Sequence, residues 1–140
     1  MSDAASKLLI MTVLAGLAKS FLLTEAIELT LALLLGVRDR KGMLLVFLAN
    51  LMTNPTAVLI FFAVSFTAGS KVAAFAAIPI EIAVLISEWR LYFSRPDMLD
   101  TGRLIFARAA GQPGRETATL IFSLILNASS YGLGALISAR

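Results

Sequence analysis

Residues 42–70 form a run of 29 consecutive residues without a charged side chain. As an α-helix this run would extend about 43 Å, whereas the hydrocarbon core of a bilayer is about 30 Å thick. No other feature constrains the fold as strongly, because a helix this long and this apolar is suited to crossing a membrane. Composition agrees, since 59% of the residues are hydrophobic and the mean hydropathy is +0.88, above the values of soluble domains.

Three further apolar segments make this chain a polytopic membrane protein in our prediction. Spans are expected over residues 18–37, 43–68, 72–93 and 117–139, which gives one all-α transmembrane domain over residues 1–140, a bundle of four helices. The polar connection at 94–116 holds Leu104, Ile105 and Phe106, for which we expect a short amphipathic segment lying on the membrane. Residues 8–17 are expected to extend the first helix, and a cleaved signal peptide over 1–18 is the alternative.

Basic residues are unevenly distributed between the two sides of this predicted bundle. The segments 38–41 and 90–115 together hold eight Lys and Arg residues, while the other side holds Lys7, Lys71 and Arg140, with Lys19 at its edge. The positive-inside rule then puts both basic loops in the cytoplasm and both termini outside, in a prokaryotic inner (cell) membrane. This topological role explains the net charge of +3 better than nucleic-acid binding, which we do not expect.

The chain contains no cysteine and no histidine. Their absence excludes disulfides and thiolate metal ligands, and it removes the commonest general base. Enzymatic activity is therefore less expected than a binding or transport role.

Acidic and amide side chains recur inside the predicted spans. Counting about 1.5 Å per residue from the cytoplasmic end of each span places five of them roughly 12–18 Å deep, near the bilayer midplane: Glu25, Glu28, Asn54, Glu81 and Asn127. Glu88 lies nearer the cytoplasm, and Asn50 shares a helix face with Asn54. Because a carboxylate at this depth is costly, we expect these side chains to face the bundle interior or a wet cavity.

Glu25, Glu28 and Glu81 have no basic residue at their predicted depth. They must therefore bind protons, bind a cation, meet a basic residue of a partner chain, or lie in water; the structural alternative is a network of protonated side chains. Carboxylate and amide oxygens suit a hard cation such as Mg²⁺, Ca²⁺, Mn²⁺ or Na⁺. We predict a cation or proton site at these three glutamates. The residues expected to bind substrate are Asn50, Asn54, Glu88 and Asn127.

Other features of the spans have simpler interpretations. Ser130, Gly134 and Ser138 are spaced four residues apart, which predicts close packing against a neighbouring helix. Lys19 is expected to extend its side chain toward the membrane interface. Pro55 and Pro79 each lie next to the polar layer, where interrupted helices can build ion sites.

Three functions are compatible with these residues. The first is a small transporter or channel-like protein, which four helices would form only as a homo-oligomer or within a larger membrane complex. The second is a non-catalytic membrane subunit whose acids pair with a partner's transmembrane helices, and the third is an intramembrane enzyme. In length and in a first-span glutamate the chain resembles the small multidrug transporters, but its biased loop charges differ from the near-neutral loops expected of them, so no family is assigned.

Overall fold

The computed structural model describes residues 3–111 and 113–138, and all regular structure within them is helical. The long helices are α1 (Asp3–Leu34), α2 (Arg40–Ala68), α3 (Ser70–Ser94) and α5 (Arg115–Ser138). A 3₁₀ turn, η1 (Thr101–Arg103), and a short helix, α4 (Ile105–Ala109), lie in the connection between α3 and α5. The predicted all-α fold is confirmed.

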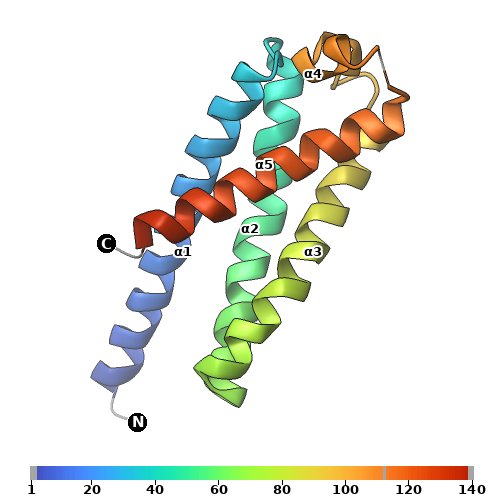
Figure 1. The fold of residues 1–140 in the computed structure, drawn as a ribbon. Coiled ribbons are helices and arrows are strands. Elements are labelled where there is room, and N and C mark those ends of the chain that lie inside the picture. Colours follow the sequence, from blue (N-terminus) through green and yellow to red (C-terminus); the bar gives the residue numbers. More distant parts are fainter. Residues whose placement is uncertain (1–2, 112, 139–140) are drawn as a thin grey trace.

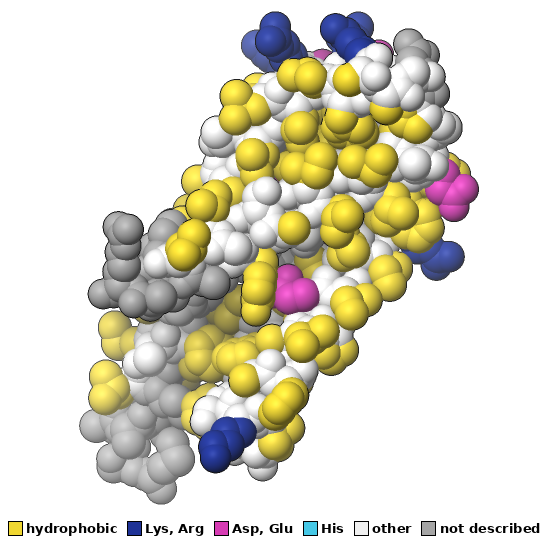
Figure 2. Space-filling model, in the orientation of Figure 1, with side chains coloured by type: hydrophobic (Ala, Val, Ile, Leu, Met, Phe, Trp, Pro, Cys, Tyr) yellow, Lys and Arg dark blue, Asp and Glu magenta, His cyan; other side chains and the backbone are white. Residues whose placement is uncertain are grey.

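Three segments of the described chain are long and apolar enough to cross a membrane. They are Ile10–Leu34, Arg40–Ala68 and Ser70–Ser94. Their outer surface is apolar, with Phe75 77% exposed and Met11 69% exposed, and Figure 2 shows hydrophobic side chains over much of one face. This apolar exterior indicates a membrane protein. The fourth predicted span lies on α5, which is not among the three segments, so the count of four spans is not confirmed.

Helices α1, α2 and α3 lie side by side, while α5 runs obliquely across them (Figure 1). Because the chain reverses between consecutive helices, α1 and α3 point in the same direction and α2 points in the opposite one. Helix α5 contacts both α1 and α3. It starts at the end where the connections gather and finishes beside the middle of α1, so it covers only one half of the bundle (Figure 1).

The first helix differs from the predicted span at both ends. It continues without a break from Asp3, and it ends at Leu34 rather than at residue 37. Gly36 has a φ of 108°, and the Val37 amide donates to the Ala32 carbonyl at 2.9 Å, which is the bond pattern of a glycine-terminated helix. Asp39 then caps α2 by accepting a hydrogen bond from the Gly42 amide at 2.8 Å.

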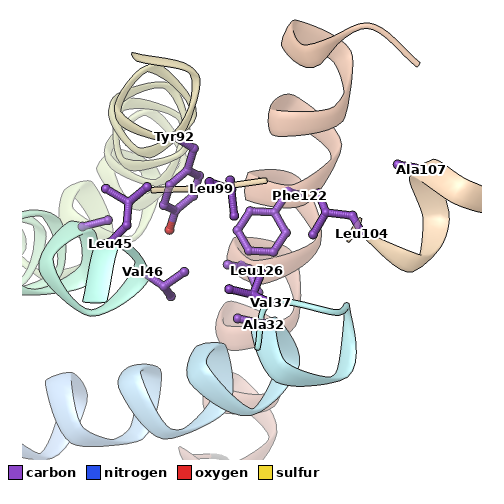
Figure 3. Close-up of a cluster of buried hydrophobic side chains, with 11 residues drawn as sticks. Ala32, Val37, Leu45, Val46, Tyr92, Leu99, Leu104, Ala107, Phe122 and Leu126 are labelled. Atoms are coloured by element: carbon purple, nitrogen blue, oxygen red, sulfur yellow. The ribbon is translucent and has the colours of Figure 1, made fainter. Parts of the chain in front are cut away.

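The apolar core lies at the end of the bundle where the connections meet. Tyr92 of α3 and Phe122 of α5 pack edge to face, with ring centroids 5.3 Å apart (Figure 3). Leu104 and Ala107, beside and within α4, are buried in this core, whereas Ile105 is 55% exposed. The short segment expected to lie on the membrane is therefore also anchored in the protein.

Two contacts hold the connections together. The Ile105 amide donates to the Leu35 carbonyl at 2.9 Å, which joins the α1–α2 turn to the start of α4. The Arg115 guanidinium donates to three carbonyls, those of Tyr92 (2.8 Å), Leu99 (2.9 Å) and Phe93 (3.2 Å). Both basic loops consequently lie at one end of the bundle, the end at the top of Figure 1.

Neither proline interrupts its helix. Pro55 lies inside α2 and Pro79 inside α3, and both helices continue on each side of the ring. The prolines therefore do not create broken helices at the polar layer, although each removes one backbone donor.

Candidate functional site

Glu28 is buried at the meeting point of three helices. Its side chain is only 1% exposed, and its two carboxylate oxygens accept from separate partners. Asn50 Nδ2 on α2 donates to Oε2 at 3.0 Å, and Ser130 Oγ on α5 donates to Oε1 at 2.8 Å. The carboxyl group of α1 thus connects α2 to α5 through neutral hydrogen-bond donors.

Glu88 of α3 is held in the same manner and is fully buried. Thr53 Oγ1 on α2 donates to its Oε1 at 2.7 Å, and Asn127 Nδ2 on α5 donates to its Oε2 at 2.6 Å. Asn127 Nδ2 also lies 3.0 Å from the Ser123 carbonyl one turn earlier. The two buried carboxyl groups therefore bind all four long helices to one another.

Near each of these two carboxyl groups, one hydroxyl lies within hydrogen-bond distance of two acceptors but carries only one hydrogen. This shortage of hydrogens is removed if the carboxyl group is protonated. Ser130 Oγ lies within 2.8 Å of Glu28 Oε1 and 3.1 Å of the Asn127 carbonyl, yet a hydroxyl carries one hydrogen. Thr53 Oγ1 likewise lies near both Glu88 Oε1 and the Ala49 carbonyl, at 2.7 and 3.0 Å. If each carboxyl group carried a proton, it would donate to the hydroxyl, and the hydroxyl hydrogen would then satisfy the carbonyl.

Glu25 and Tyr92 contain buried polar atoms that lack partners. Glu25 is 7% exposed, and within the described chain neither carboxylate oxygen has a hydrogen-bond partner; the same holds for the Tyr92 hydroxyl. Buried polar atoms are almost always satisfied, so these mark places for a proton, a water molecule or a ligand. No group of three acidic side chains close enough to hold a metal ion occurs among the described residues.

A cleft of about 500 Å³ lies between the four long helices. Its polar lining includes Glu28 and Asn50 from the buried network, together with Lys19, Glu81 and Tyr131. Figure 2 shows an acidic side chain in the hollow below α5, where that helix leaves the other half of the bundle uncovered. A polar cleft inside an apolar bundle is the usual setting for a ligand site in a membrane protein.

The predicted polar layer divides into two levels in the structure. Glu88, expected near the cytoplasm, belongs to the buried network, whereas Glu81 lies two helical turns away at the cleft. Asn54 Oδ1 accepts from Ser20 Oγ at 3.4 Å instead of contacting a glutamate. Counting from helix ends did not give the relative heights of these residues in the bundle, because the helix ends are not level. Thr53 is 13 residues into α2, whereas its partner Glu88 is six residues before the end of α3.

Sequence reasoning missed three polar residues of this region. Thr53 and Ser130 are carboxyl partners, and Ser130 could have been found because it continues the helix face of Ser123 and Asn127. Its predicted role was helix packing; the side chains of Gly134 and Ser138 lie outside the described residues. Lys19 lies within the apolar segment Ile10–Leu34 and lines the cleft, a contact that its predicted role at the membrane interface did not include.

Within the described residues, no Lys or Arg forms an ion pair with Glu25, Glu28, Glu81 or Glu88. An ion pair of 3.0 Å does join Arg103 and Asp100, in the α3–α5 connection. Among the described residues, the donors to Glu28 and Glu88 are thus all neutral. No family model matches the chain, and neither the curated proteins nor the solved structures contain a match to it.

Proposed function

We propose that this chain is a small membrane transporter or channel-like protein that binds a cation, or a substrate coupled to protons, in the cleft. The observation that supports this most is Glu28, which lines the cleft and also belongs to the buried network with Asn50 and Ser130. An acid inside a membrane bundle without a basic partner is typically functional, since a purely structural role is filled more cheaply by neutral side chains.

The proposed coupling between cation and proton uses one carboxyl group at the cleft, that of Glu81, and one in the buried network, that of Glu28. A cation entering the cleft meets oxygen ligands from Glu81, Asn54 and Glu28, which suit Na⁺, Mg²⁺, Ca²⁺ or Mn²⁺. Its arrival near Glu28 favours release of a proton from that carboxyl group, and Ser130 then donates to the carboxylate instead of to the Asn127 carbonyl. Binding of a cation and release of a proton are coupled in this way.

The proposed setting is a prokaryotic cell membrane with the basic loops in the cytoplasm. In support, both loops lie at one end of the bundle, and α1 begins at the opposite end (Figure 1). Because α5 covers only half of the bundle, the cleft is open on the uncovered side. A second copy of the chain in a homo-oligomer would close that side.

Purified protein in liposomes that contain a pH indicator tests this proposal. Each candidate cation is added outside, and proton efflux is recorded. We expect exchange with at least one cation, abolished by Glu28→Gln and preserved in Glu116→Gln, a matched change at an exposed glutamate outside the cleft. Flux equal to that of protein-free liposomes for every cation and for small zwitterions would refute it.

A non-catalytic membrane subunit is the second candidate, and the uncovered half of the bundle favours it. A partner's transmembrane helix would fit where α5 ends, and a basic residue on it would pair with Glu81. Purification in mild detergent separates the two candidates: a stoichiometric second protein supports the subunit role, and a homogeneous assembly of this chain supports transport.

A further inference from the structure

Lys19 and Glu81 carry opposite charges and line the same cleft from different helices. Lys19 belongs to α1 and Glu81 to α3, and they do not form an ion pair with each other or with another described residue. Lys19 is exposed and Glu81 is half-buried. Both residues line the cleft, and within the described part of the chain neither charge is paired.

Their positions along the helices bring them to the same half of the cleft. Lys19 precedes the buried Glu28 by nine residues, about 13 Å, and Glu81 precedes the buried Glu88 by seven residues, about 10 Å. Because α1 and α3 point in the same direction, both charged residues are displaced the same way from the buried network. They lie on two walls of the half that α5 leaves uncovered.

The surroundings of this pair are suited to a small amphipathic molecule. Ser20, Asn54 and Tyr131 supply hydrogen-bonding groups in the lining, and Val58 and Phe61 supply apolar contacts. A cleft of about 500 Å³ is within the size range of small-molecule sites.

Charge balance then distinguishes between classes of ligand. A simple cation bound at Glu81 leaves the Lys19 ammonium uncompensated, and a simple anion at Lys19 leaves the Glu81 carboxylate uncompensated. A ligand that carries one positive and one negative group satisfies both and adds no net charge to a site of low dielectric, where unpaired charges are costly.

We propose that the cleft binds a small zwitterion, with its ammonium group on Glu81 and its carboxylate group on Lys19. This rests on the proposed function, because it takes the cleft as the transport site, and it names the substrate class. The buried carboxyl groups of Glu28 and Glu88 then bind and release protons, while Lys19 and Glu81 at the cleft recognise the substrate.

The test is a binding series on the purified full chain in detergent, read as a shift in melting temperature and as a Kd by calorimetry. The probes are ω-amino acids of increasing chain length, each matched by the alkylamine and the alkyl carboxylate of the same length. We expect a zwitterion of one optimal length to bind more tightly than both singly charged analogues. Lys19→Met and Glu81→Gln should each weaken it roughly ten- to hundredfold, the factor for losing a hydrogen bond to a charged group.

Matched variants control for folding and for general charge effects. Lys71→Met and Glu116→Gln remove exposed charges outside the cleft and should leave the Kd unchanged. Lys19→Arg and Glu81→Asp retain the charges and should bind measurably. The double variant Lys19→Glu with Glu81→Lys should regain affinity relative to either single change, because the ligand can bind in the reversed orientation.

Two results overturn the inference. If the alkylamine binds as tightly as the zwitterion and Lys19→Met has no effect, the ligand is a simple cation; the transport proposal then stands and this one fails. If no zwitterion binds while Na⁺, a divalent cation or acid stabilises the protein through Glu28, the inference again fails alone. Absence of both responses contradicts the transport proposal as well.

Discussion

The Ser130 hydroxyl on α5 donates a hydrogen bond of 2.8 Å to the Glu28 carboxylate on α1, across 102 positions of the sequence. Both side chains are buried, at 8% and 1% exposure. This bond brings the last helix onto the first and leaves the Glu28 carboxyl group at the wall of the cleft. The same contact therefore serves the fold and the proposed proton chemistry.

Ser130→Ala should destabilise the protein by about 1–2 kcal/mol, because Glu28 loses one of its two donors and hydrogen bonds inside membrane bundles are of this size. The measurement is thermal or denaturant unfolding in detergent. Ser129→Ala is the matched control, since Ser129 is adjacent and its side chain makes no hydrogen bond to any described residue. Equal stability of the two variants would contradict the assigned contact.

Thr53→Val should destabilise by a similar amount, about 1–2 kcal/mol, because valine keeps the shape of threonine but cannot donate to Glu88. Thr56→Val is the control: the Thr56 hydroxyl is bonded to the Met52 carbonyl of its own helix, at 2.8 Å. A second test combines Thr53→Val with Glu88→Gln. If the two residues interact, the combined loss should differ from the sum of the single losses.

Gly36→Ala should destabilise by more than Gly111→Ala. Both glycines have positive φ, 108° and 76°, so each substitution introduces backbone strain of about 1–3 kcal/mol. A Cβ at position 36 would in addition lie 2.6 Å from the Arg103 carbonyl oxygen, whereas one at position 111 would meet nothing within 4 Å. Unfolding curves of the two variants decide this, and a larger loss at position 111 would mean that the α1–α2 turn is packed differently.

Arg115→Met should reduce stability by at least about 2 kcal/mol, because the guanidinium holds three backbone carbonyls at the end of α3 and in the following connection. Arg95→Met removes a nearby exposed arginine whose side chain makes no such bonds within residues 3–111 and 113–138, and it should have little effect. Arg115→Lys is informative as well, since a lysine cannot reproduce the planar fork and should recover only part of the loss.

The helices were predictable from the sequence, since a run such as 42–70 carries no charge and can cross a membrane only as a helix. The end of α1 was not, because it depends on how Gly36 closes the helix beside Arg103, a residue distant in sequence. The angle of α5 was also beyond prediction. It follows from packing between Tyr92 and Phe122 and from the tie at Arg115, not from hydropathy.

The residue types of the candidate site were predictable from the sequence, but which acid is hydrogen-bonded to which amide was not. The expectation that intramembrane acids and amides face the bundle interior holds for Glu28, which is buried, and for Asn127, which is half-buried and bonded to Glu88. Which amide donates to which acid depends on the relative heights of the helices. Asn127 therefore donates a hydrogen bond to Glu88 rather than to Glu81. That Lys19 lines the cleft depends on how α1 packs against the other helices, which hydropathy does not give.

A cation or proton site at Glu28 can be tested by the melting temperature of the purified protein with Na⁺, K⁺, Mg²⁺, Ca²⁺ or Mn²⁺, each at about pH 5 and about pH 8, for the native chain, Glu28→Gln and Glu116→Gln. We expect selective stabilisation by one cation at the higher pH, or by acid, that Glu28→Gln removes and Glu116→Gln retains. An identical response of all three proteins to every cation and to pH would contradict a cation or proton site at Glu28.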